Sequence, residues 1–151
     1  MSRSVEPSAP RAALLLVRYQ QAMLTADADA FADLYHADAV HEFPFRTAAN
    51  VPRLRGREEV RRFYQKAWAD RPIEITRIDD VAVHTGDDPD TVVGEMRING
   101  IMRSTGAEFS LSTVVVITSR DGAIVKVRDY MDTFGLASQT GTLRALVERS
   151  A

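Results

Sequence analysis

A single carboxylate on an otherwise apolar strand face is the feature of this sequence best suited to chemistry. Between Ala123 and Asp132 the residue types alternate, so Val127, Asp129 and Met131 share one face of an extended strand. A carboxylate among apolar neighbours is poorly solvated and can act as a general base or acid near neutral pH. The alternative is a solvated or ion-paired Asp129 at the end of the strand.

A second strand, Thr91–Arg103, places Arg97 and Asn99 on one side and Met96 and Ile98 on the other. Alternation alone favours the polar side in water and the methionine and isoleucine in the core. The opposite orientation would direct a cation and an amide into a pocket.

His41 can pair with Asp129 as a proton shuttle, or it can be a surface residue at a strand end. The sequence holds two more histidines, His36 and His84, at no spacing that is typical of metal ligands, so a metal site is not expected. Nucleophile elbows and glycine-rich phosphate loops are also absent from the sequence. Proton transfer by a carboxylate is therefore the favoured chemistry.

Four large aromatic residues recur at helical spacing, and they can line a pocket for a planar ligand or form ordinary core: Phe31, Phe63, Tyr64 and Trp68. Tyr19 has the same two interpretations, as a hydrogen-bond donor to a ligand or as a packed helix residue.

The elements that must position these residues change type at Pro72. Before Pro72, apolar periodicity predicts three helices. The first runs from Arg11 to about Thr25, the second contains Phe31, Leu34 and Tyr35 with Asp27 or Asp29 as its N-cap, and the third begins at Gly56. An extended segment at 39–45 and a loop at 46–55 separate the second helix from the third. After Pro72, period-two segments separated by turn residues predict four antiparallel strands, at 73–84, 91–103, 108–119 and 123–132. A last helix is expected at 136–149. The sequence thus predicts an α+β fold with three helices on one curved sheet, forming a single domain over 11–151 after a disordered tail at 1–10.

Composition narrows the function classes. The chain has no cysteine, which excludes disulfides and thiolate chemistry. A formal net charge of −2 gives no electrostatic reason to expect a nucleic acid partner. No apolar run approaches the about 18 residues that span a bilayer, and no secretion signal precedes Pro10, so a cytoplasmic protein with no membrane partner is expected.

Three segments carry a resemblance to a known family: Leu34–Pro44, Arg55–Val60 and Asp121–Asp132, which contain LYHADAVHEFP, RGREEV and DGAIVKVRDYMD. In this order they resemble the SnoaL-like and nuclear transport factor 2-like superfamily, which includes ketosteroid isomerase and limonene-type epoxide hydrolases. The resemblance implies a cone-shaped fold, a pocket for a small apolar molecule and a homodimer formed through the outer face of the sheet.

The resemblance also assigns roles. Asp129 matches the catalytic base of the epoxide hydrolases, and Arg97 matches a pocket residue that would hold it by charge-assisted hydrogen bonds. However, Asn99 stands where those hydrolases have their general acid, and His41 and Phe43 replace their water-holding residues. Ordinary limonene-type hydrolysis is therefore not expected.

Ketosteroid isomerase offers a partial match. Tyr19 matches its oxyanion-binding tyrosine, but its base aspartate falls on Phe43, so that mechanism is not expected either.

The function expected from the sequence is a cyclase or isomerase of specialised metabolism that needs no cofactor. Asp129 would move a proton on an apolar polyketide-like or terpenoid-like substrate, with Arg97 orienting it and His41 able to relay the proton. Tyr19 and Asn99 would bind the substrate oxygen, in a pocket lined by Phe43, Trp68, Leu111 and Val127. The alternatives are an epoxide-opening enzyme in which His41 is the acid, and a non-catalytic ligand-binding protein.

Overall fold

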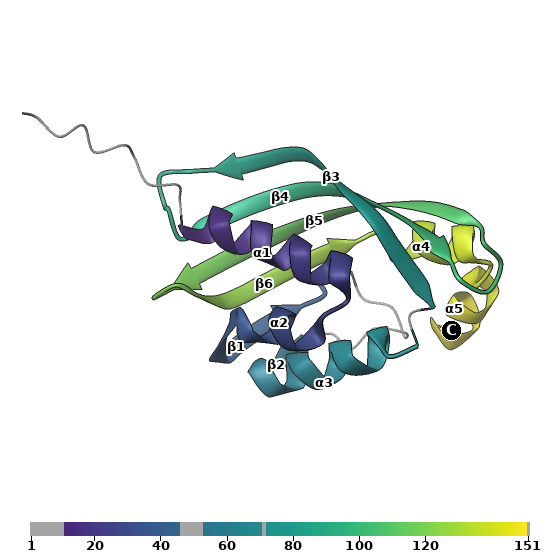
Figure 1. Cartoon of the computed structure of the whole chain (residues 1–151), viewed down its shortest axis with the longest axis horizontal. Helices are drawn as coiled ribbons and strands as arrows, with labels where there is room; N and C mark the ends of the chain where they lie inside the picture. The colour runs from purple at the N-terminus through teal and green to yellow at the C-terminus, as the bar shows by residue number, and fades with distance from the viewer. Residues whose placement is uncertain (1–10, 46–52, 71, 151) are drawn as a thin grey trace, which may run out of the picture.

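The computed structural model describes residues 11–45, 53–70 and 72–150. Its centre is a six-stranded sheet in the order β2-β1-β6-β5-β4-β3 (Figure 1). The strands are β1 (Tyr35–Glu42), β2 (Arg53–Arg55), β3 (Ile73–Thr85), β4 (Thr91–Met102), β5 (Glu108–Arg120) and β6 (Ala123–Met131). The four long strands start where the sequence predicted and form the expected antiparallel meander.

One strand pair departs from the expected antiparallel sheet. β1 runs parallel to β6, with His41 opposite Val127 and Glu42 opposite Arg128. It then pairs antiparallel with β2, which lies in the segment predicted as a loop. The parallel pair matters for the site because it joins the His41 strand directly to the Asp129 strand.

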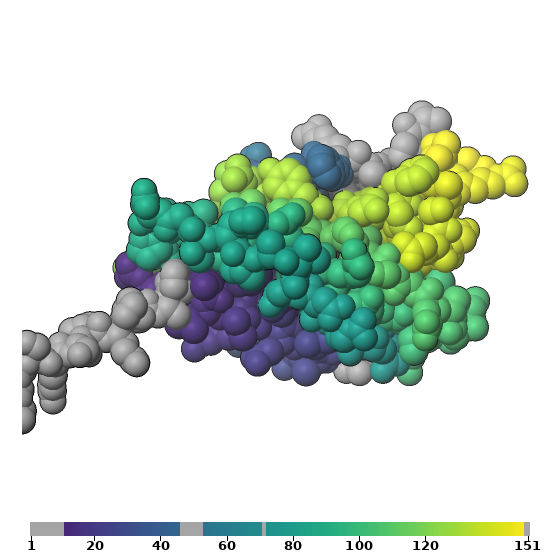
Figure 2. All heavy atoms as spheres, turned by 90° about the horizontal axis from the view of Figure 1, so that it is seen from above, coloured from purple at the N-terminus to yellow at the C-terminus, as the bar shows by residue number. Residues whose placement is uncertain are grey.

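The helices are α1 (Arg11–Thr25), α2 (Ala28–Asp33), α3 (Arg57–Trp68), α4 (Thr133–Thr140) and α5 (Leu143–Ser150). The first three pack against one side of the sheet as predicted, and α4 and α5 lie at the end far from the start of α1 (Figures 1 and 2). The single C-terminal helix predicted at 136–149 is wrong. Gly141 adopts a left-handed conformation with φ of 74° and ends α4, so a second short helix follows.

The second helix is shorter than predicted. Asp27 is its N-cap and accepts a hydrogen bond from the Ala30 N–H at 2.9 Å, but the helix ends at Asp33. The Ile124 N–H donates to the Leu34 carbonyl, and Tyr35 begins β1 opposite Ile124. Tyr35 is therefore a strand residue, and its ring is fully buried.

The core lies between α1–α3 and the inner face of the sheet. Met96 and Ile98 point into it and are 1% and 5% exposed, whereas Arg97 is exposed on the outer face. α1 approaches β4 closely, since a Cβ on Gly94 would lie only 2.9 Å from a methyl group of Leu16. Simple alternation therefore predicted the orientation of β4 correctly.

Among the described residues, none of the helices combines the length and apolar character that crossing a membrane requires. Within the same residues, no cluster of three or more His, Cys, Asp or Glu side chains could hold a metal ion. The predicted tail at 1–10 and the predicted loop residues 46–52 lie outside the described residues.

Candidate active site

An apolar cavity of about 290 Å³ lies between the inner face of the sheet and the helices α1–α3. Aromatic rings form much of its wall: Tyr19, Phe31, Phe43, Phe63, Tyr64, Trp68 and Phe109. Phe31 is the hub of this group, with ring centroids at 4.7 Å from Tyr19, 4.5 Å from Tyr64 and 5.3 Å from Trp68. Aliphatic side chains from β3, β4 and β5, including Leu111, complete the wall. Such a cavity suits a small, mostly apolar ligand.

Two carboxylates are the charged groups on the described wall of the cavity, Asp129 and Glu74. Glu74 is exposed, whereas the Asp129 side chain is only 12% exposed and shares its strand face with the buried Val127. The sequence-based prediction of a carboxylate on an apolar face is therefore met by the structure. A ligand in the cavity would meet a negative charge on an otherwise apolar wall.

His41 lies directly behind Asp129. Its Nε2 atom is 3.6 Å from Oδ2 of Asp129, and its side chain has no exposed surface. The surface-histidine alternative is therefore wrong. His41 does not belong to the cavity wall, so it can influence a ligand only through Asp129 or through other wall residues.

Hydroxyl groups complete the polar surroundings of this pair. Thr113 Oγ1 donates to Oδ1 of Asp129 at 3.2 Å. On the histidine, the Tyr35 hydroxyl lies 2.8 Å from Nδ1 and the Tyr64 hydroxyl 3.4 Å from Nε2. Asp129 and His41 therefore sit in a small polar network enclosed by aromatic rings.

The tyrosines of this network, and Tyr19 on the cavity wall, hold their protons firmly. Burial raises the pKa of Tyr19, Tyr35 and Tyr64 well above the usual 10.0, and the negative charge of Asp129 raises each pKa further. A phenol that stays protonated is a hydrogen-bond donor at all physiological pH values. Tyr19 and Tyr64, which border the cavity, can thus donate to an oxygen atom of a ligand.

The predicted site residues fall into two groups. Asp129, Tyr19, Phe43, Trp68 and Leu111 line the cavity, and His41 supports it from behind. Val127 is not part of the wall, and its side chain packs in the hydrophobic core instead.

Arg97 and Asn99 require a correction. Both lie on the outer face of β4, where Arg97 is opposite Ser112 and Asn99 opposite Ser110. The Asn99 amide bonds to Asp79 at 3.1 Å and to Ser110 at 3.2 Å. Neither residue can reach Asp129 through the sheet, so the orienting role expected for Arg97 and the substrate-binding role expected for Asn99 are wrong. The pleat of β4 decides this, since Met96 and Ile98 occupy the inner face.

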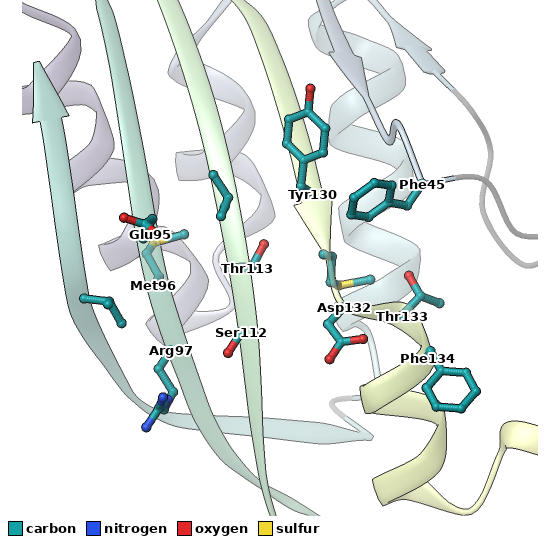
Figure 3. A pocket seen from close by; sticks show the side chains of 13 residues that line it. Phe45, Glu95, Met96, Arg97, Ser112, Thr113, Tyr130, Asp132, Thr133 and Phe134 are labelled. Carbon is teal, nitrogen blue, oxygen red and sulfur yellow. The ribbon is translucent and has the colours of Figure 1, made fainter. Parts of the chain in front are cut away.

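The outer face carries a larger hollow, of about 560 Å³, between β3–β6 and the start of α4. Figure 3 shows Glu95 and Arg97 along one side of it, with Tyr130, Phe45 and Phe134 on the other. The rings of Phe45 and Tyr130 meet edge to face at 5.4 Å. Its charged side chains are open to solvent, where charges interact weakly, so we place the chemistry in the smaller inner cavity.

Three functional residues were missed or left open by sequence reasoning. Thr113 and Tyr35 received no role, and Tyr64 was left between pocket and core. Thr113 stands out only as a polar residue on the buried face of a strand with Leu111, Val115 and Ile117. That signal could have identified it, because buried polar groups need partners.

Comparison with known proteins agrees with this fold. The family model of the SnoaL-like domain matches residues 16–127. An uncharacterised PhzA/B-like protein of Pseudomonas aeruginosa is 30% identical over 120 residues, which cover 77% of this chain and 80% of that protein. The chain therefore belongs to the SnoaL-like domain family.

Solved structures share the architecture. A candidate isomerase from Bacillus subtilis superposes with a TM-score of 0.78 at 26% identity, covering 87% of this chain and 94% of that one. A candidate polyketide cyclase from Xanthomonas campestris superposes with a TM-score of 0.72 at 23% identity, covering 88% of this chain and 98% of that one. An epoxide hydrolase of Mycobacterium tuberculosis that resembles limonene-epoxide hydrolase superposes with a TM-score of 0.66 at 20% identity, covering 95% of this chain and 100% of that one. At these identities the last two show the fold alone.

Proposed function

We propose that this protein is a general acid/base enzyme, an isomerase or cyclase, that moves a proton on a small, uncharged and mostly apolar carbonyl compound. The observation that carries the proposal is the position of Asp129, a nearly buried carboxylate that lines an aromatic cavity and has a histidine 3.6 Å behind it. A base in such a dry site acts on a substrate without competition from bulk water.

The side chains on the wall of the inner cavity indicate the class of substrate. Apolar and aromatic side chains favour a hydrocarbon skeleton, and a cavity of about 290 Å³ limits its size. Both charged residues on the described wall are acidic, so carboxylate or phosphate groups on a substrate would be repelled. A neutral polyketide-like or terpenoid-like ketone meets these conditions.

The proposed reaction starts with removal of a proton from the carbon beside the carbonyl group. The C–H bond breaks, the proton moves to a carboxylate oxygen of Asp129, and the electron pair forms an enolate. Tyr19 and Tyr64 donate to the enolate oxygen, because their phenols stay protonated next to Asp129. In a β,γ-unsaturated ketone the enolate is conjugated with the C=C bond, and return of the proton from Asp129 to the γ-carbon completes a double-bond shift. In a substrate with a second carbonyl group, attack of the enolate carbon on that carbonyl forms the new C–C bond, and the proton on Asp129 passes to the resulting alkoxide oxygen to complete an aldol closure.

Epoxide opening is the second candidate. Asp129 can activate a water molecule, but His41 cannot protonate the opening epoxide directly because it has no surface on the cavity. Tyr64, on the wall and within 3.4 Å of His41, is then the favoured acid.

The test uses proton exchange, which needs no knowledge of the natural substrate. The protein is mixed with 2-tetralone or a β,γ-unsaturated cyclic ketone in D2O, and loss of the α-proton signals is followed by proton NMR. Binding is followed by the fluorescence of Trp68, the single tryptophan of the chain, which lines the cavity. We expect catalysed exchange that falls about 100- to 10,000-fold in Asp129→Asn.

Arg97→Gln is the matched control, since it removes a charge from the outer face and should leave exchange unchanged. Exchange that persists in Asp129→Asn would refute the proposal. Ketones that quench Trp68 without any exchange would refute it too and would favour a binding protein. Hydrolysis of styrene oxide that depends on Asp129, without ketone exchange, would favour the epoxide candidate.

A further inference from the structure

The buried His41 ring has polar neighbours at both of its nitrogen atoms. Nδ1 lies 2.8 Å from the Tyr35 hydroxyl, and Nε2 lies 3.4 Å from the Tyr64 hydroxyl and 3.6 Å from Oδ2 of Asp129. A neutral imidazole has one N–H donor and one lone pair, so its neighbours decide which nitrogen carries the proton.

The carboxylate of Asp129 settles one side of this choice. An ionised carboxylate can only accept, so the nitrogen that faces it, Nε2, is the one that benefits from carrying the proton. The opposite tautomer would direct the Nε2 lone pair at a carboxylate oxygen, which is repulsive in a buried site.

The Tyr35 hydroxyl settles the other side. In the part of the chain that the structure describes, His41 Nδ1 is its hydrogen-bond partner, and it has no second one. If Nδ1 carried the proton, the tyrosine oxygen would accept it and the buried phenol proton would be left without an acceptor. Burial raises the pKa of Tyr35 well above 10.0, so this phenol has a proton to donate.

Tyr35 is itself held in place. The guanidinium Nε of Arg57 donates to the Tyr35 carbonyl at 2.8 Å, and the tyrosine ring packs against Phe31 at 5.5 Å. Its ring lies nearly parallel to that of His41, with an interplanar angle of 23° and a centroid distance of 6.0 Å. The donor therefore has little freedom to turn away from Nδ1.

We propose that Tyr35 is a positioning residue, which donates to Nδ1 of His41 and so fixes the histidine as the tautomer with its proton on Nε2, directed at Asp129. His41 then acts as a donor that orients the carboxylate, and it has no lone pair available to accept the substrate proton. The proton taken from the substrate stays on Asp129 until it is returned. The tautomer assignment stands on geometry alone, whereas its consequence for proton transfer rests on the proposed function.

Nitrogen NMR on the full chain labelled with 15N-histidine tests the assignment without any substrate. Long-range proton–nitrogen correlations distinguish a protonated ring nitrogen from one with a lone pair, and His36→Gln and His84→Gln assign the remaining signals to His41. We expect Nε2 protonated and Nδ1 unprotonated in the wild type. A protonated Nδ1, alone or together with Nε2, would overturn the proposal.

Two tyrosine variants separate the role of Tyr35 from that of its neighbour. In Tyr35→Phe the donor to Nδ1 is lost, so we expect a mixture of tautomers. In Tyr64→Phe that donor remains, so the tautomer should be unchanged. An unchanged tautomer in Tyr35→Phe would show that Asp129 fixes it alone, and would refute the role of Tyr35.

Replacing the histidine itself provides a test that does not require Tyr35→Phe to fold. The amide nitrogen of Gln reaches the position of Nε2 and can donate to Asp129, whereas that of Asn reaches only the position of Nδ1. We expect His41→Gln to retain ketone exchange within about tenfold and His41→Asn to lose about 100-fold, as expected for loss of an orienting donor. Equal loss in both variants would contradict the donor role.

The two proposals fail separately. The expected tautomer without ketone exchange would refute the proposed function and leave the assignment intact. Exchange that depends on Asp129, with His41 protonated at Nδ1, would refute the assignment and leave the proposed function intact.

Discussion

The Nε2 atom of His41 lies 3.6 Å from Oδ2 of Asp129 because the parallel pairing of β1 with β6 sets His41 opposite Val127. Paired residues point to the same side of a sheet, and Asp129 follows Val127 by one pleat. A shift of β1 by one residue would turn His41 to the outer face and leave the carboxylate without its nitrogen partner. The register of β1 against β6 therefore sets the geometry of the site, and the apolar residues that face the core fix this register.

Removal of the Thr113 hydroxyl should weaken the base. Thr113 donates to Oδ1 of Asp129 at 3.2 Å, and a hydrogen bond to a charged group is worth about 1.5–3 kcal/mol. We expect Thr113→Val to lower the ketone exchange rate about 10- to 100-fold, because valine has nearly the shape of threonine but no hydroxyl group. Thr118→Val makes the same chemical change on the outer face of the same strand and should have no effect. Equal rates in the two variants would show that Asp129 does not depend on this hydroxyl.

Phe31 should carry much of the stability of the cavity wall. It is fully buried and touches the rings of Tyr19, Tyr64 and Trp68, which come from α1 and α3. Truncation of a buried phenylalanine costs about 3–5 kcal/mol. Urea unfolding should show this loss for Phe31→Ala, while Val147→Ala, at a residue of α5 that is 58% exposed, should change the free energy of unfolding by less than about 0.5 kcal/mol. Similar unfolding midpoints for the two variants would contradict this role.

The sequence predicts the four long strands well because their signals are local. Turn residues follow each period-two segment, so the starts of β3, β4, β5 and β6 could be located to the residue. The break between α4 and α5 was missed because the apolar spacing continues past Gly141, and only its left-handed conformation ends the helix.

The site likewise has features that the sequence predicts and features that it does not. The face of Asp129 follows from alternation on one strand, and alternation also placed Arg97 outward, against the orientation taken from the resemblance. The contacts of Asp129 with His41 and Thr113 depend on register between strands far apart in the sequence. Tyr35 was placed in a helix, so its bond to His41 could not be foreseen.

Alkaline pH should destabilise the protein through its buried tyrosines. Burial, with a contribution from Asp129, raises the pKa of Tyr19, Tyr35 and Tyr64 above the unfolded value of 10.0, so above about pH 10 the unfolded chain loses protons that the folded chain keeps. The stabilisation is complete below pH 10 and is lost as pH rises through the raised values. Each fully buried tyrosine contributes about 1.4 kcal/mol per pH unit, so the three contribute at most about 4 kcal/mol per pH unit. Tyr64 contributes less than the other two because its side chain is partly exposed.

Tyrosinate absorbance and far-UV circular dichroism, recorded together during an alkaline titration, check this prediction. Most of the tyrosine ionisation should coincide with loss of secondary structure. Tyr19→Phe should ionise one tyrosine fewer in that step and reduce the slope of stability against pH. Ionisation of all the tyrosines well before unfolding would contradict the burial of these phenols.

The outer hollow should be covered by a second copy of the chain. Phe45, Val81 and Phe134 line it and are 60%, 62% and 66% exposed, an unusual set of apolar side chains to leave in water. Glu95 and Arg97 stand two residues apart on the same face of β4 (Figure 3). In a two-fold dimer with antiparallel β4 strands, Glu95 of each copy would face Arg97 of the other, so the surface complements itself in charge. Sedimentation should then give twice the chain mass of 16.8 kDa.

Charge exchange tests this arrangement directly. Arg97→Glu would set like charges opposite each other and should shift the protein toward monomer, whereas the double variant Glu95→Arg, Arg97→Glu restores opposite charges and should restore the dimer. Glu95 also lies 2.7 Å from His84 of its own chain, so His84→Gln is the control for loss of that contact. A monomeric wild type, or a dimer insensitive to Arg97→Glu, would rule out pairing through these charges. Since Arg97 lies outside the inner cavity, ketone exchange by the monomeric variant would show in addition that one copy holds a complete site.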